Sequence, residues 1–204
     1  TCEQAMAIGR AAAMVLIETK HGRPRVVIGK DTRASSDMLE AALCAGLCSV
    51  GADVLPLGVI PTPAVAYLVG KYGADAGIMI SASHNPCEYN GIKLFDGNGN
   101  KLPDTLEAEI DQIVLDGKKT PPVPTGGAVG RILPPRPAVD DYVFHLLSTT
   151  QTDLRGMRLA VDCANGSASA TARKLFSALG ADCVFLNDQP DGTNINDNCG
   201  STHM

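Results

Sequence analysis

A short polar loop, residues 81–86 (SASHNP), carries the side chains with the clearest chemical potential. It follows the apolar run 78–80, whose length and composition are typical of a buried strand. The Asn-Pro pair that closes the loop favours a turn and disfavours helix. The hydroxyl of Ser83 is therefore expected on a rigid loop at a strand end, with the imidazole of His84 next to it and the ammonium of Lys93 ten residues later.

A nucleophile, a polar neighbour and a cation together are what a covalent phosphoryl-transfer site requires. Three other interpretations remain open. The stretch could be an ordinary loop, part of a phosphate-binding module without catalysis, or the centre of a serine hydrolase. The hydrolase is the weakest of these, because adjacent residues on an extended loop point apart and Ser83 has no Gly-x-Ser-x-Gly elbow around it.

The order of the residues in this stretch favours the phosphoryl-transfer interpretation. Residues 81–86, followed by Asn-Gly-Ile-Lys at 90–93, resemble the phosphoserine loop of the α-D-phosphohexomutases, and most closely that of the phosphoglucosamine mutases. The resemblance implies that Ser83 carries the phosphoryl group and that Lys93 is the acid/base lysine. It also implies an isomerase that moves a phosphoryl group between the 1- and 6-positions of a sugar through a bisphosphorylated intermediate.

Further site residues follow from the same resemblance. His84 and Asn85 are expected to contact phosphate, as is Arg33 in the segment Gly-Lys-Asp-Thr-Arg-Ala-Ser-Ser at 29–36. A phosphate contact near a helix N-terminus, a surface ion pair and a structural role beside the site all remain open for Arg33. Ser81, where phosphoglucomutases and phosphomannomutases more often have Thr, favours glucosamine phosphate as the substrate.

The resemblance also implies cofactors and partners. Mg2+ would bridge the phosphate on Ser83 and an Asp-Gly-Asp-x-Asp-Arg-like loop, which these 204 residues do not contain. A phosphosugar substrate and a hexose 1,6-bisphosphate activator are expected. Thr1 begins directly at a helix, so we expect the native N-terminus to be missing. The chain then corresponds to a first domain and part of a second, and we expect it to lack turnover by itself.

Alternating helices and strands predict an α/β fold, with a mixed, mainly parallel sheet flanked by helices and an incomplete second α/β domain. The last strand of the first sheet could pair antiparallel after its short connection. A Pro/Gly-rich stretch, 118–137, indicates the domain junction, giving domains 1–137 and 138–204. Helices are predicted at 1–22, 36–50, 62–69, 104–117, 139–147 and 167–180, and strands at 25–29, 54–57, 78–80, 92–95, 157–162 and 183–186.

Local signals refine these elements. Thr1 and Gln4 form a capping-box pattern, hydroxyls at 35 and 36 are expected to cap the second helix, and Asp104 is expected to cap the fourth. Pro56 indicates an edge strand. The turn at Asp96 superficially resembles a calcium loop but has one carboxylate only. Residues 163–167 are expected to serve a bend, without the spaced glycines of a dinucleotide site.

Composition limits the remaining classes of function. Net charge is -5, aromatic residues make up 4% and there is no Trp, so nucleic acid is not expected as a partner. No apolar stretch approaches the ~18 residues of a membrane span. Seven dispersed cysteines without a Cys-x-x-Cys motif favour reduced thiols and a cytoplasmic location over zinc or disulfides. An open sheet edge in the second domain would favour a homodimer.

Overall fold

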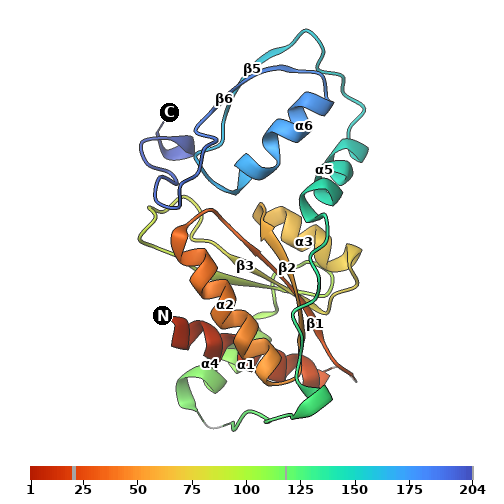
Figure 1. Ribbon diagram of the computed structural model, residues 1–204, viewed down its shortest axis with the longest axis vertical. Helices are drawn as coiled ribbons and strands as arrows, with labels where there is room; N and C mark the ends of the chain where they lie inside the picture. The colour runs from red at the N-terminus through yellow and green to blue at the C-terminus, as the bar shows by residue number, and fades with distance from the viewer. Residues whose placement is uncertain (20–21, 118, 204) are drawn as a thin grey trace.

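The computed structural model describes residues 1–19, 22–117 and 119–203. Its larger part, here called the first unit, spans residues 1–117 and is a layered α/β structure (Figure 1). The predicted end of the first helix near Gly22 adjoins residues 20–21, which lie outside the described residues. The elements of the first unit are α1 (Cys2–Thr19), β1 (Arg25–Lys30), α2 (Ala34–Ser49), β2 (Asp53–Val59), α3 (Thr62–Lys71), β3 (Ala76–Ile80), β4 (Ile92–Asp96) and α4 (Asp104–Asp116).

The sheet of the first unit has the order β2-β1-β3-β4. Strand β1 pairs parallel with both β2 and β3, whereas β4 pairs antiparallel with β3. The predicted mixed, mainly parallel sheet is confirmed. Strand β2, which contains Pro56, lies at one end of this order, as expected for a residue that cannot donate a ladder hydrogen bond.

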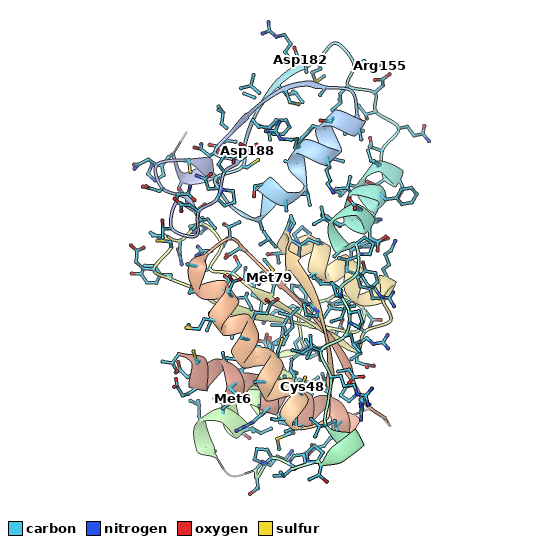
Figure 2. The ribbon with its side chains drawn as sticks, viewed as in Figure 1. Met6, Cys48, Met79, Arg155, Asp182 and Asp188 are labelled. Atoms are coloured by element: carbon cyan, nitrogen blue, oxygen red, sulfur yellow. The ribbon has the colours of Figure 1, made fainter. Side chains whose placement is uncertain are left out.

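Helices cover both faces of this sheet (Figure 1). Side chains of α1 and α2 pack with Ile28, Ile78 and other residues on one face, and α3 packs against the opposite face around Met79. Met79, labelled in Figure 2, is fully buried in the cluster that contains the α3 side chains. Gly29 and Gly77 allow α3 to approach, because a Cβ at either position would lie 2.5 Å from a methyl group of α3.

The predicted helix ends agree with the structure in part. The capping box of α1 is confirmed, since the Gln4 N–H donates to the Thr1 hydroxyl (3.3 Å) and the Thr1 amino group donates to the Gln4 side chain (3.0 Å). The predicted caps at Ser35 or Ser36 and at Asp104 are wrong. Both helices begin earlier than the patterns suggested, after Arg33 and Pro103, so these polar residues lie inside the first turn and make no capping bond.

The second unit, residues 154–203, is smaller. Its strands β5 (Arg158–Asp162) and β6 (Asp182–Leu186) pair parallel, as predicted for a βαβ unit, with α6 (Ala172–Ala178) between them in the chain. Both strands alternate between exposed and half-buried residues. Short 3-10 turns complete it, η2 (Ser167–Ala170) and η3 (Gly200–Thr202). Figure 2 shows Arg155 and Asp182 at its outer end.

The segment between the units is attached to the first sheet. It contains the turn η1 (Gly126–Ala128) and then runs beside β2. The Val54 N–H donates to the Arg131 carbonyl (2.8 Å), and the Leu133 N–H donates to the Val54 carbonyl (2.7 Å). Helix α5 (Ala138–Ser148) follows, and its Tyr142 is buried in the core between α3 and the sheet. Helix α5 thus contacts the first unit through Tyr142 and the second through the bond of Asp140 with Lys174. The division into domains 1–137 and 138–204 remains a prediction.

All seven cysteines lie as free thiols. Within the described ranges, no helix combines the length and the apolar character needed to cross a bilayer.

Candidate functional site

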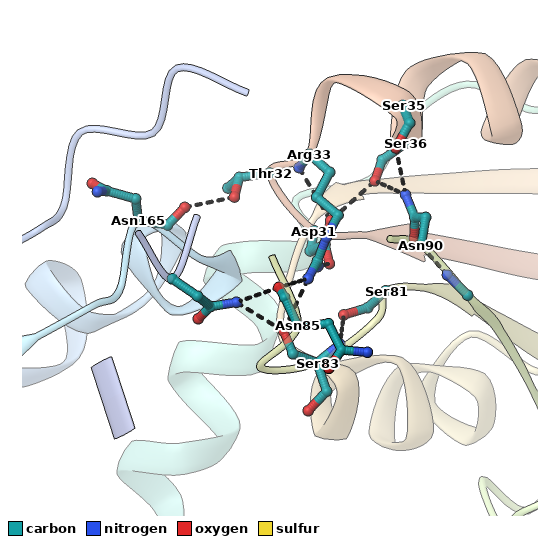
Figure 3. A network of polar contacts seen from close by, with 12 residues as sticks. Asp31, Thr32, Arg33, Ser35, Ser36, Ser81, Ser83, Asn85, Asn90 and Asn165 are labelled. Carbon is teal, nitrogen blue, oxygen red and sulfur yellow. Dashed lines mark hydrogen bonds and ion pairs between the residues drawn. The ribbon is translucent and has the colours of Figure 1, made fainter. Parts of the chain in front are cut away.

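The loop 81–86, hereafter the serine loop, begins where β3 ends (Figure 3). Strand β1 ends beside it, and the Asp31 N–H after β1 donates to the Ile80 carbonyl (3.0 Å). The Ser81 N–H donates to the Gly91 carbonyl (2.9 Å), which ties the beginning of the loop to the residue just before β4. The carboxyl ends of parallel strands are a common place for ligand sites in α/β sheets, and the predicted site lies there.

Within the serine loop the two hydroxyls have different roles. Ser81 is buried, and its hydroxyl accepts the Ser83 N–H (3.0 Å). Ser83 is exposed and has φ +58°, a left-handed conformation that is uncommon for a residue with a side chain. Such a conformation persists only where surrounding contacts impose it. The structure therefore presents Ser83 to solvent and uses Ser81 to hold it.

Arg33 is a second residue of the first unit that holds Ser83 in this conformation. Its side chain is fully buried and forms an ion pair with the buried carboxylate of Asp31. One terminal nitrogen, Nη2, donates to the carbonyls of Ser83 (3.2 Å) and Asn85 (2.5 Å). Of the interpretations left open for Arg33, a surface ion pair is wrong because the guanidinium is buried. The observed bonds give it a structural role beneath the serine loop, and direct phosphate contact by Arg33 remains a prediction.

The hydroxyls that were expected to cap α2 belong to the same network (Figure 3). Ser36 is buried and donates to Asp31 (3.0 Å), so the carboxylate of Asp31 competes successfully for this hydroxyl. The Asn90 amide donates to the hydroxyls of Ser35 (2.9 Å) and Ser36 (3.0 Å). The turn before β4 is thereby fixed to the start of α2, which adds a third support beside the serine loop.

The second unit contributes a residue that the sequence did not identify. The side-chain amide of Asn196 donates to the Ser83 carbonyl (3.1 Å) and the Asn85 carbonyl (3.0 Å), the same two oxygens that Arg33 contacts. Two more bonds attach this unit to the loop after β1. Thr32 donates from its hydroxyl to the Asn165 carbonyl (2.6 Å), and the Ala34 N–H donates to the Gly192 carbonyl (2.8 Å).

Asn165 and its neighbours serve the bend after β5, as predicted. Asn165 has φ +48° and is buried, and its side chain bonds to backbone groups of residues 189 and 194. Asp162 accepts the N–H groups of Ala164 (2.8 Å) and Gly200 (2.9 Å). These bonds, that of Ala164 most, hold the pKa of Asp162 below its usual value. The bend is therefore built from its own polar groups.

A cavity of about 320 Å3 lies between the serine loop and the second unit. Its wall includes Ser83 and His84 on one side and the start of α3 and the turn η2 on others. Cys163 also lines it, but burial raises the pKa of this thiol, which disfavours the nucleophilic thiolate. Of the two side chains Ser83 and Cys163, Ser83 is the better-presented nucleophile.

The remaining predicted residues differ in position. His84 and Asn85 are exposed on the serine loop, and His84 lines the cavity. Lys93 is exposed on β4 and is not part of the cavity wall. Among the described residues, no imidazole or carboxylate is hydrogen-bonded to the Ser83 hydroxyl, so the arrangement of a serine hydrolase is not formed.

The donor set does not make a magnesium site by itself. Asp31 is the acidic residue that lines the cavity, and its carboxylate is already bonded to Arg33 and Ser36. In the described part of the chain, no three His, Cys, Asp or Glu side chains lie close enough together to hold a metal ion. Magnesium prefers oxygen ligands in octahedral geometry, which these residues do not supply.

Comparison with known proteins gives the family of this fold. Residues 1–121 match the family model described as phosphoglucomutase/phosphomannomutase, alpha/beta/alpha domain I. The chain belongs to the phosphoglucomutase/phosphomannomutase family. The resemblance seen in the serine loop is therefore confirmed over the first unit.

Several curated proteins of this family are similar to the whole chain. It is 55% identical over 203 residues to the phosphoglucosamine mutases of Clostridium perfringens and Clostridium acetobutylicum, and 53% identical over 205 residues to that of Acetivibrio thermocellus. Each match covers 100% of this chain and 45% of the relative. The chain thus spans less than half the length of these phosphohexomutases.

Solved structures agree on the fold. A phosphoglucomutase/phosphomannomutase family protein from Burkholderia thailandensis is 30% identical, with a TM-score of 0.77 over 94% of this chain and 41% of that protein. Parafusin, a phosphoglucomutase from Paramecium, is 16% identical with a TM-score of 0.67 over 91% of this chain and 40% of that protein, a likeness of fold alone.

Proposed function

We propose that the protein to which this chain belongs is a phosphosugar mutase that converts glucosamine 6-phosphate to glucosamine 1-phosphate. The observation that carries the proposal is Ser83, an exposed hydroxyl on a left-handed loop residue whose carbonyl is held by both units. The curated relatives named phosphoglucosamine mutase, at 53–55% identity, support the choice of sugar over the glucose and mannose phosphates of other phosphohexomutases.

The reaction requires two phosphoryl transfers at Ser83. Phospho-Ser83 gives its phosphoryl group to the free hydroxyl of the sugar phosphate, so the serine O–P bond breaks and a new sugar O–P bond forms. The bisphosphorylated sugar turns over in the site. The Ser83 oxygen then takes back the phosphoryl group from the other position. A hexose 1,6-bisphosphate can load Ser83 in the same manner, which explains the proposed activator.

The chain's other residues assist this transfer. We assign Lys93 to proton transfer with the sugar hydroxyl or to neutralising the transferring phosphoryl group, and His84 and Asn85 to phosphate contacts. Magnesium would neutralise phosphate charge when bound, and Ser83, through its phosphate, is the group of this chain that we assign to it. Because the side chains that the structure describes do not form a metal site by themselves, residues 1–204 alone are expected not to turn over phosphosugar.

The decisive experiment uses the full-length protein with glucose 1,6-bisphosphate. We expect the intact mass to increase by one phosphate, located on the peptide that contains Ser83, and glucosamine phosphate to be isomerised. Ser83→Ala should abolish both. Phosphate that persists in Ser83→Ala would place the nucleophile elsewhere. Phosphosugar binding without any phosphoserine would instead support a non-catalytic phosphate-binding module.

A second variant tests the lysine. Lys93→Met should lower turnover by at least about 10²-fold, the usual cost of losing acid/base assistance. Lys101→Met is a suitable control, since Lys101 is also exposed but pairs with Asp104 and Glu107 on the surface. Turnover of Lys93→Met within a few-fold of the wild type would refute the assignment.

A further inference from the structure

We propose that Asn196 is a positioning residue for phosphoryl transfer at Ser83, because its side-chain amide and the guanidinium of Arg33 together hold the carbonyls of Ser83 and Asn85. The proposal rests on the function proposed above. Its consequence is that the geometry of the nucleophile depends on the second unit as well as on the first.

The hydrogen bonds form a double clamp. The two carbonyl oxygens each accept one bond from Arg33, at 3.2 and 2.5 Å, and one from Asn196, at 3.1 and 3.0 Å. A carbonyl oxygen has two lone pairs, so both acceptors are fully used. Asn196 reaches them across 113 and 111 residues of sequence. This amide is therefore a direct link between the second unit and the backbone of the nucleophile.

The amide is held in place by its own loop. The Asp191 carboxylate accepts three bonds of 2.8–2.9 Å from residues 193 and 194, which makes a compact turn just before Asn196. The carbonyl of Gly192 in this turn accepts the Ala34 N–H. A Cβ at Gly192 would lie 3.1 Å from the Cβ of Ala34, so the two segments are in close contact. The Asn196 N–H donates to the Ala164 carbonyl (2.9 Å). Asn196 is thus fixed relative to the start of α2, not merely near the serine loop.

Holding the carbonyls also orients a donor. In a trans peptide the C=O and the following N–H point in opposite directions, so drawing the Ser83 carbonyl toward Arg33 and Asn196 turns the His84 N–H away from them. No hydrogen bond of the His84 N–H occurs within the described part of the chain. This leaves a backbone donor beside the Ser83 hydroxyl for the phosphoryl oxygens. Preorganised donors of this type stabilise charge that develops during transfer.

A pair of matched variants in the full-length protein tests the clamp. Asn196 and Asn198 both have left-handed backbones, φ +59° and +50°, which Asp tolerates. The Asn198 amide donates to its neighbour Asp197, and it is not a donor to the two serine-loop carbonyls. Asn196→Asp replaces the donor by a carboxylate that repels the two carbonyls, whereas the control Asn198→Asp introduces the same charge two residues away.

We expect Asn196→Asp to lower kcat for glucosamine phosphate by about 10- to 100-fold, in line with the cost of a small misplacement of a reacting group. KM should stay within about twofold, since the Asn196 amide, although it lines the cavity, already donates to the two carbonyls of the serine loop. Hydrogen exchange of the serine loop should be faster in Asn196→Asp than in the wild type or Asn198→Asp. A kcat within about threefold of the wild type, or an equal loss in both variants, would overturn the proposal.

The positioning role and the proposed function can fail separately. If the wild type is neither phosphorylated on Ser83 nor active on any phosphosugar, the proposed function fails. The hydrogen-exchange comparison then decides the clamp alone. Equal exchange of the serine loop in the two variants would overturn it, and selective acceleration in Asn196→Asp would support it as a device that orders this loop.

Discussion

The strands of the two units differ in how their faces are covered. Every residue of β3 is buried, as are the four central residues of β1. In β5 and β6, half-buried residues alternate with exposed ones, and Val184 and Leu186 are 61% and 46% exposed. Helices lie on both faces of the first sheet, whereas α6 covers the second on one side (Figure 1). The first unit therefore holds its shape through burial, and the second gains much of its position from contacts with the first.

The candidate site lies where these two kinds of structure meet. The first unit supplies the nucleophile and the buried pair of Arg33 and Asp31. The second unit supplies the Asn196 side chain. It also supplies two backbone carbonyls, which accept hydrogen bonds from the Thr32 hydroxyl and the Ala34 N–H. The serine loop is thus supported by the buried first unit and by a second unit that is attached to it mainly through hydrogen bonds. Substitutions in the first unit should therefore affect the serine loop differently from substitutions in the second.

The largest effect should come from the buried ion pair of the first unit. Arg33→Met leaves the Asp31 carboxylate buried without its cation, which typically costs about 3–5 kcal/mol. Arg173→Met is the matched control in the second unit. Arg173 forms an ion pair with Asp188, but its side chain is 61% exposed, so its loss should cost less. The measurement is urea unfolding followed by circular dichroism. Comparable losses in both variants would contradict the contrast between the units.

Truncation of apolar side chains should sharpen the same contrast. Leu47 is fully buried, so Leu47→Ala is expected to reduce the free energy of unfolding by about 2–5 kcal/mol. Val184→Ala should change it by at most about 0.5 kcal/mol, since Val184 is mostly exposed. Thermal and urea unfolding of each variant provide the comparison. Equal losses would show that the second sheet is packed as tightly as the first.

The smallest effect concerns the joint between the units. Tyr72 donates to Asp141 of α5 (2.6 Å), and Lys71 pairs with the same carboxylate (3.2 Å). Tyr72→Phe should cost about 1 kcal/mol. The hydroxyl of Tyr72 first, then Lys71, holds the pKa of Asp141 below its ordinary 3.8. The folded state therefore favours the carboxylate, and this contribution is complete above pH 3.8 and lost as the pH falls through the lowered pKa.

The pH dependence gives this last variant its own check. The difference in unfolding free energy between wild type and Tyr72→Phe should be constant near neutral pH and shrink on acidification below 3.8. Lys71→Met should weaken the same dependence to a smaller extent. A difference that grows toward acid would mean that the hydroxyl favours the protonated carboxyl instead.

Sequence patterns were sufficient for the fold because its elements are locally encoded. The alternation of apolar runs and helical periodicity predicted the order of strands and helices, and the Pro in β2 correctly indicated an edge. Helix starts were less predictable. Ser36 looked like a cap by type, but the buried carboxylate of Asp31 offers its hydroxyl a better partner. Such competition depends on tertiary structure and leaves no local pattern.

The site divides in the same way. Ser83, His84 and Asn85 stand in one short motif, and the structure places all three on the exposed loop at the end of β3. Asn196 belongs to a polar segment whose role could not be derived from its composition, because its partners lie more than 100 residues earlier in the chain.

The pairing of the linker with β2 has a consequence for how readily the two units stay together. Residues 118–137 would form a twenty-residue tether between the first unit and α5, but the bonds at Arg131 and Leu133 leave only four residues, 134–137, before this helix. The entropic cost of closing a loop rises with its length. Because the bonds to β2 shorten the free part of the tether, they raise the effective concentration of the second unit at the first. A few hydrogen bonds can then keep Asn196 at the serine loop, although the same bonds would be too weak between separate molecules.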